Sequence, residues 1–169
     1  VANVKNMSGM FCGSQTDTLD LSSWDTSKVT DMNWMFCDCK ATDINLNGWN
    51  TSKVTNMSGM FSGCEALTLN LRWFDTSNVI TMREMFSNSK ATIIDLSGFE
   101  TSQVEDMRFM FCESSITVLD LRSFDISNAL DVASMFQDSR IITGYAKTQS
   151  DADKLNASSY KPTTLTFVA

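Results

Sequence analysis

The sequence contains no histidine, and this absence limits the chemistry that the chain can perform. Without imidazole, the chain lacks the commonest general base, the serine and cysteine triads that depend on it, and the ligand that most zinc sites use. The chain also has no apolar run of the roughly 18 residues that a membrane span requires. We therefore expect neither an enzyme nor a membrane-inserted protein, and we expect no cofactor and no bound metal.

Positive charge is scarce, because 13 Lys and Arg residues stand against 20 Asp and Glu residues and give a net charge of −7. Nucleic acids and anionic membranes bind through clustered Lys and Arg side chains, so we expect neither partner. A neutral or basic partner fits this charge better. The chain opens at Val1 without a signal sequence, which predicts a piece excised from a longer protein.

The chain does contain an internal repeat. The pattern Met-x-x-Met-Phe returns every 25 residues, and all 11 methionines occupy its two Met positions. Self-similarity at a fixed period indicates a stacked array of structural units. The copies of this pattern begin at Met7, Met32, Met57, Met82, Met107 and, where valine replaces the first methionine, Val132. A second pattern, an apolar residue followed by Asp or Asn and then Leu, begins at Leu19, Ile44, Leu69, Ile94 and Leu119.

The spacing within one unit predicts two short elements. In residues 29–36 the apolar side chains lie at i, i+3, i+6 and i+7, which predicts a short helix with one buried face. Residues 25–27, Asp-Thr-Ser, provide oxygens for the free amides of its first turn and predict an N-cap. Residues 17–21 alternate in polarity and predict a brief strand with Leu19 and Leu21 pointing inward.

A unit of this size cannot bury its own apolar side, so neighbouring units must stack and share one core. We predict an α/β fold, namely a right-handed leucine-rich-repeat solenoid with a narrow parallel sheet on one face and short helices on the other. Residues 1–145 form the array of about six units, of which the first is partial. Residues 146–169 form a C-terminal cap, with a helix over about 148–156 and a strand over 163–168.

The segment from Trp24 to Cys39 resembles, almost residue for residue, the W-D-T-S-x-V-T-x-M-x-x-M-F-x-x-C unit of the BspA-like bacterial surface repeats. The resemblance covers roughly residues 3–145. The unit here is one residue shorter than the family's commoner unit, and Ala41, Ala66 and Ala91 stand where the first Leu of its strand motif would be. The resemblance implies a secreted or surface-displayed protein of bacteria, or of protists with similar genes, used for adhesion or protein recognition.

The outward position of the predicted strands carries a column of carboxylates and amides. Stacking would place these groups about 5 Å apart, so Asp95 and Asp120 would be neighbouring like charges. We expect Arg72 and Arg122 to offset them by diagonal pairing. A solvated polar face with amide ladders is the simplest interpretation, and bridging Ca²⁺ is a less favoured one because no D-x-D-x-D loop is present. The column consists of Asp20, Asn45, Asn70, Asp95 and Asp120.

Trp73 stands where other units have Ser or Gly, so no core position requires its ring. Trp and Arg are enriched at binding hot spots, and Trp73 beside Arg72 is therefore our candidate anchor for a partner. Folding of the ring over the rim of the array is the alternative. We expect an extracellular or cell-surface recognition or adhesion module that binds a protein or another host-surface macromolecule through this face.

Two further features keep alternatives open. Cys12 with Cys37, and Cys39 with Cys64, lie one unit apart, at a spacing that permits disulfides, but ladder geometry and the odd cysteine count favour free thiols. The N-terminal edge of the array is apolar, so the alternative function is a structural subunit that self-associates there. That edge comprises Val4, Met7, Met10 and Phe11.

Overall fold

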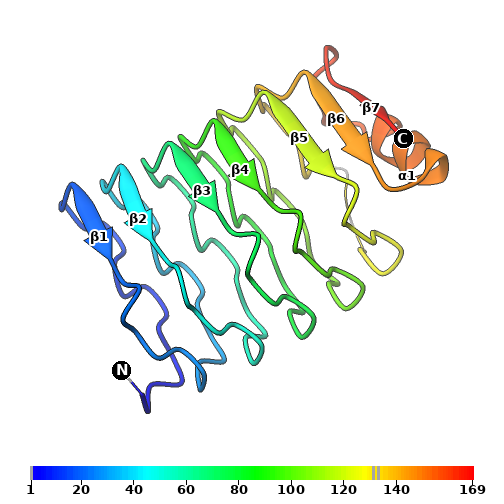
Figure 1. Cartoon of the computed structure of the whole chain (residues 1–169). Coiled ribbons are helices and arrows are strands. Elements are labelled where there is room, and N and C mark those ends of the chain that lie inside the picture. Colours follow the sequence, from blue (N-terminus) through cyan, green and yellow to red (C-terminus); the bar gives the residue numbers. More distant parts are fainter. Residues whose placement is uncertain (1, 131, 133) are drawn as a thin grey trace.

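The computed structural model of the chain is a parallel-strand β-solenoid of about six turns (Figure 1). It describes residues 2–130, 132 and 134–169; Val1, Asp131 and Ala133, which the sequence assigns to the repeat array, lie outside the described residues. Each turn of chain, which we call a coil, contributes one strand, and Figure 1 shows these strands side by side along one edge of the stack. The strands are β1 (Thr18–Asp20), β2 (Asp43–Asn45), β3 (Thr68–Asn70), β4 (Ile93–Asp95), β5 (Val118–Leu121), β6 (Thr143–Ala146) and β7 (Thr166–Val168).

The strands pair in parallel, as predicted, but they do not form one sheet. Hydrogen bonds join β1 to β2, β3 to β4, and β5 to β6 and β7. In these pairs Leu19 lies opposite Ile44 and Leu69 opposite Ile94. Between the described strands, the ladder is interrupted from β2 to β3 and again from β4 to β5. The prediction of a single narrow sheet is therefore wrong.

The residue three positions after the outward Asp or Asn of each strand differs between the paired and the interrupted coils. A Cβ atom on Gly98 would lie 1.9 Å from the carbonyl oxygen of Arg72, so the coil that contains β4 approaches its predecessor closely because Gly98 has no side chain. Gly48 takes the same place after β2. Trp73 and Ser123 take it after β3 and β5, and these are the two strands that are not bonded to their predecessors. From β2 to β5, glycine at this position accompanies a paired strand and a larger residue accompanies an interrupted ladder.

The Met-x-x-Met-Phe segments are consecutive turns and not the predicted helices. Met35 donates its amide to Met32 O within one turn, at 3.3 Å, whereas Phe36 donates to Met60 O in the next coil, at 2.8 Å. Alternate amides thus bond to the next coil, whereas an α-helix beyond its first turn bonds each amide to the carbonyl four residues earlier. Trp34 also has φ 55°, which ends any helix. The other left-handed residues at equivalent positions of these segments are Asp38, Glu84, Asn88, Phe109, Glu113 and Asp138, with Gly9, Gly13, Gly59 and Gly63.

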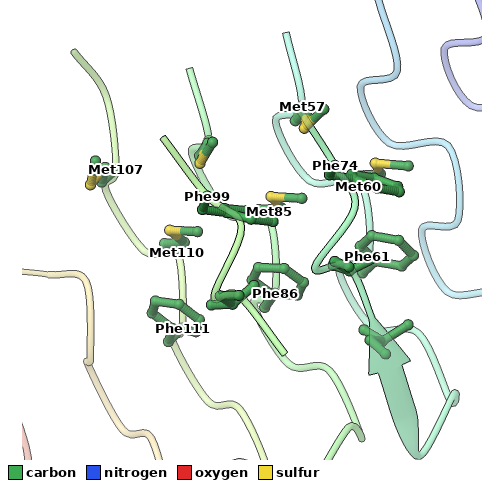
Figure 2. Close-up of a cluster of buried hydrophobic side chains, with 14 of the residues drawn as sticks. Met57, Met60, Phe61, Phe74, Met85, Phe86, Phe99, Met107, Met110 and Phe111 are labelled. Atoms are coloured by element: carbon green, nitrogen blue, oxygen red, sulfur yellow. The ribbon is translucent and has the colours of Figure 1, made fainter. Parts of the chain in front are cut away.

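The predicted buried face is confirmed although the helix is not. Val29, Met32, Met35 and Phe36 have no exposed surface. The repeated side chains stack on one another from coil to coil, as the rings of Phe36 and Phe61 do with centroids 5.3 Å apart and planes 8° apart. Figure 2 shows the methionine and phenylalanine ladders of the central coils. Each coil therefore completes the core of its neighbours.

No helix follows the Asp-Thr-Ser trio, so the prediction that it is an N-cap is wrong. The trio instead joins neighbouring coils. The buried Thr26 hydroxyl donates to Asn50 O at 3.0 Å and accepts from Asn50 N at 2.9 Å. Asp25 accepts the amide of Ser27 at 3.0 Å, which turns the chain at the corner. These bonds satisfy backbone groups of the corner that lie outside the strands. Equivalent buried hydroxyls are those of Thr51, Thr76 and Thr101.

The C-terminal residues cover the last coil. Helix α1 (Gln149–Asn156) begins after Thr148, whose side chain accepts an amide of the first turn. Leu155 of α1 is buried, and the ring of Phe167 in β7 lies 5.0 Å from that of Phe136. The predicted helix is confirmed, and the predicted strand is shorter than expected because it begins only at Thr166.

Candidate functional site

The predicted site residues lie on one side of the solenoid, which we call the strand face: the outward side chains of β1 to β6 and the corner residues 72, 73 and 122. Asp20, Asn70 and Asp120 are exposed, whereas Asn45 and Asp95 are half-buried. The corner residues Arg72, Trp73 and Arg122 are all exposed.

The carboxylates at the strand ends hold the corners of the coils. Asp95 accepts the Ser97 hydroxyl at 2.6 Å and the Ser97 amide at 3.0 Å, and Asp20 accepts the same two groups from Ser22. The Ser97 hydrogen bonds hold the pKa of Asp95 below its usual value, and the nearby positive charge of Arg72 adds to this effect. The Ser22 hydrogen bonds lower the pKa of Asp20 in the same way. Both groups are therefore ionised at neutral pH.

The column contains one amide ladder and one ion pair. The Asn45 side chain donates to Asp20 Oδ1 at 3.0 Å, as the polar-ladder interpretation expects. Arg122 donates to both carboxylate oxygens of Asp120, with Nη2 2.6 Å from Oδ2. This pair lies within one coil, so the predicted diagonal pairing of Arg122 is wrong. The Arg122 amide also donates to Asp120, and this turn brings the guanidinium onto the carboxylate of its own coil.

Trp73 is the most prominent aromatic group of the strand face, with 65% of its surface exposed. The guanidinium carbon of Arg72 lies 4.1 Å from the centre of the Trp73 ring. Arg122 approaches the ring of Tyr145 in a similar way, at 5.5 Å. Stacking of a planar guanidinium on an aromatic face restrains both side chains, so these pairs present ordered surfaces to solvent.

Open grooves lie along the strand face, both where the strand ladder is interrupted and between the paired strands β1 and β2. The groove between β4 and β5 has a volume of about 480 Å³, and its lining includes Ile94, Asp95, Asp120 and Arg122. Ile94 packs against the core and is only half-buried, so an apolar floor lies between polar walls. A groove of about 350 Å³ between β2 and β3 is lined in the same way by Ile44, Asn45 and Asn70, among others.

An aliphatic row beside the carboxylates was missed by the sequence analysis. Ile93 and Val118, the first residues of β4 and β5, are 64% and 56% exposed. Leu67 and Ile142, each one residue before a strand, are also exposed. The sequence does indicate that Ile93 and Val118 face outward, since the equivalent residues of β1 to β3 are the polar Thr or Asp.

The structure gives no indication of a metal centre or of a membrane span in the part of the chain that it describes. Within residues 2–130, 132 and 134–169, no group of three or more His, Cys, Asp or Glu side chains could hold a metal ion. No helix in this part of the chain is long and apolar enough to cross a bilayer.

A family model described as "Mycoplasma protein of unknown function, DUF285" matches residues 1–92 and, a second time, residues 38–149. The chain belongs to this family. The two matches overlap within the array, as a repeated structure permits. No curated protein and no solved structure shows significant similarity to this DUF285 chain.

Proposed function

We propose that the protein is an extracellular or cell-surface recognition or adhesion module that binds a protein or another macromolecule through its strand face. The observation that carries the proposal is that the strand face carries exposed aromatic and aliphatic side chains, among them Trp73, Ile93 and Val118, as well as the ion pair of Asp120 with Arg122. Exposed apolar groups rimmed by polar ones are typical of interaction sites.

The charge of the molecule supports a neutral or basic partner. The net charge is −7, and the carboxylates of Asp20 and Asp95 at the strand ends accept hydrogen bonds from Ser22 and Ser97, which keep them ionised. Trp73 and Arg72 already lie against each other, so little side-chain entropy is lost when a partner packs on them. These two residues are therefore the expected anchor.

The proposal also covers the type of repeat, the location of the protein and the absence of enzymatic activity. Its coils are interpreted as 25-residue, right-handed leucine-rich repeats of the BspA-like kind, which the string from Trp24 to Cys39 and membership of DUF285 support. The surface location rests on the same resemblance. The absence of histidine from the sequence supports a binding protein and not an enzyme.

Binding to an array of immobilised extracellular proteins and glycans tests the proposal. Replacing Arg72 and Trp73 together by Ala should weaken the strongest interaction found by roughly tenfold or more, as loss of a hot spot does. The matched control is Lys53→Ala with Ile80→Ala, which also removes one exposed basic and one exposed apolar side chain but lies outside the strands. Equal losses in both variants, with unchanged circular dichroism, would contradict a site on the strand face.

A second candidate function is self-assembly through the N-terminal end of the stack. Met10 is 42% exposed there, although the equivalent Met35 is fully buried. Phe11 and Trp24, whose ring centroids are 5.7 Å apart, are only half-buried. A second copy placed end to end would cover these side chains, and the structural-subunit alternative rests on them.

A further inference from the structure

Two thiols lie together at the N-terminal end of the stack, away from the strand face. Cys12 and Cys37 follow the stacked rings of Phe11 and Phe36, whose centroids are 5.5 Å apart. The amide of Gly13 donates to Cys37 O at 2.7 Å, which holds the two coils together beside the cysteines. The amide of Phe11 likewise donates to Met35 O at 2.8 Å, so hydrogen bonds to the second coil lie on either side of Cys12. The fold thus holds the two cysteines at the same position of successive coils.

The two thiols differ in accessibility. Cys12 is exposed to solvent and Cys37 is half-buried. The Cys37 thiol also donates to Asp38 Oδ2 at 3.5 Å. Burial and the neighbouring Asp38 charge raise the pKa of Cys37 to about 12. A reagent from solvent therefore meets Cys12 first.

The chain contains a matched pair that is closed to reagents. Cys39 and Cys64 lie at the same step from one coil to the next, and both are fully buried. The amide of Glu65 donates to Cys39 O at 2.9 Å and joins their two coils. A hydrogen bond between successive coils is therefore common to both pairs, whereas access from solvent is confined to the pair that contains Cys12.

We propose that Cys12 and Cys37 form a dithiol site that a small-molecule disulfide of the glutathione class oxidises to a disulfide between the first two coils. Adjacent strands of a parallel ladder lie about 4.8 Å apart, which is within the Cα separation of roughly 4.4–6.8 Å that a disulfide allows. The hydrogen bonds from Phe11 and Gly13 to the second coil hold Cys12 and Cys37 at this spacing, and Cys12 is close enough to help raise the pKa of Cys37.

The reaction proceeds by two thiol–disulfide exchanges. The Cys12 thiolate attacks one sulfur of the reagent, whose S–S bond breaks, and a mixed disulfide forms while one small thiolate leaves. Cys37 then loses its proton and attacks the Cys12 sulfur, and the second small thiolate leaves. The two protein thiols are oxidised, the reagent is reduced to two thiols, and the protons lost by the cysteines pass through solvent to the two leaving thiolates.

The product would fasten the first coil to the second. The amides of Phe11 and Gly13 donate to Met35 O and Cys37 O across this junction. Their exchange with deuterated solvent requires the coils to separate locally, and a bridge beside them opposes that separation. Slower exchange at these two amides is therefore the physical signature of the oxidised site.

Incubation of the folded protein with oxidised glutathione, followed by non-reducing peptide mapping, tests the proposal. We expect a Cys12–Cys37 bridge and slower amide exchange at Phe11 and Gly13. Cys37→Ser should instead keep a stable glutathione adduct on Cys12, and Cys12→Ser should leave Cys37 unmodified over the same time. Cys39→Ser should behave as the unaltered protein does, because Cys39 is buried.

Several results would overturn the proposal. In the unaltered protein, a lasting glutathione adduct on Cys12, a covalent dimer through Cys12, or no reaction at all would each contradict it. So would a Cys39–Cys64 bridge in protein that retains its folded circular-dichroism spectrum. A bridge whose formation leaves amide exchange at Phe11 and Gly13 unchanged would also contradict the inferred fastening of the two coils.

Discussion

At the scale of single residues, the fold depends on side chains that are copied from coil to coil. A buried Met or Phe here contacts its own equivalent above and below, as Phe61 and Phe86 do with centroids 5.8 Å apart. The thioether of methionine is flexible and polarisable, so one residue type can fill this position in successive coils. A polar replacement therefore disturbs three coils and not one.

We predict that Met35→Asp leaves the chain unfolded, because a charge without a partner would be buried in the shared core. The control is Met10→Asp, which occupies the same position of its repeat but is 42% exposed and should keep the folded spectrum. Far-UV circular dichroism and thermal unfolding measure both. A cooperative unfolding transition for Met35→Asp near that of the unaltered protein would contradict the assigned core.

The same scale shows which site residues a sequence can reveal. Trp73 was found because its position holds Ser or Gly in other units, and the structure leaves the ring exposed. Ile93 and Val118 were missed because an aliphatic residue in a strand is ordinarily assigned to the core. Only the comparison of equivalent positions, where β1 and β3 have Thr, identifies them as outward-facing.

At the scale of elements, the sequence predicts the strands but not the turns. Apolar residues at i, i+3, i+6 and i+7 are also brought to one side by successive turns, so the periodicity that indicates a helix does not exclude this structure. Left-handed backbone at Trp34 and Glu84 decides between them, with φ of 55° and 59°. Non-glycine residues adopt this conformation rarely, and the bonds to the next coil that stabilise it are not visible within one unit.

The pairing of β3 with β4 should depend on the missing side chain of Gly98. We predict that Gly98→Ala destabilises the protein by about 1–3 kcal/mol, the range for overpacked sites, because its Cβ would lie 1.9 Å from Arg72 O. Ser23→Ala, at the equivalent exposed position before β2, should change stability little. Urea unfolding measures both variants, and equal stabilities would show that the close approach does not hold the pair together.

The hydrogen-bonded carboxylates at the coil corners predict sensitivity to acid. Serine hydrogen bonds lower the pKa of Asp20 and Asp95, and Arg122 lowers that of Asp120, from the ordinary 3.8. A lowered folded-state pKa means that the unfolded chain binds more protons in acid. The stabilisation is therefore complete above the unfolded value of 3.8 and is lost as the pH falls through the lower folded values.

We expect the urea midpoint to fall as the pH is lowered from 5 toward 3 at constant ionic strength. Asp95→Asn is the matched variant, since Asn45 occupies the equivalent position and also accepts the amide of the residue two positions on. This variant should retain the corner and lose part of the acid sensitivity. An identical pH dependence in both proteins would exclude Asp95 as a contributor.

At the scale of the whole molecule, the sequence predicts a stack of repeats whose apolar sides form one core, and the structure shows such a stack. What it does not predict is the division of the strands into separate groups, because that depends on how closely two coils approach at Gly98 or Ser123. The two grooves between β2 and β3 and between β4 and β5 lie at these interruptions. The site as a three-dimensional surface was therefore not predictable, although its charged and aromatic residues were.

The two leading functions use different parts of the molecule, and this difference gives the last prediction. Recognition uses the side of the stack, whereas self-assembly uses its N-terminal end. Met10 is exposed at that end and Phe11 is half-buried, although the equivalent residues of the next coil are buried.

We predict that adding one upstream coil with a polar outer face gives a monomer in sedimentation at micromolar concentration, because the added coil covers that end. The capped protein should still bind the extracellular array, and Arg72→Ala with Trp73→Ala should weaken that binding while leaving sedimentation unchanged. The side of the stack is the same in the capped and the uncapped protein. Loss of all binding on capping, with no effect of the double substitution, would therefore identify the N-terminal end of the stack as the functional surface.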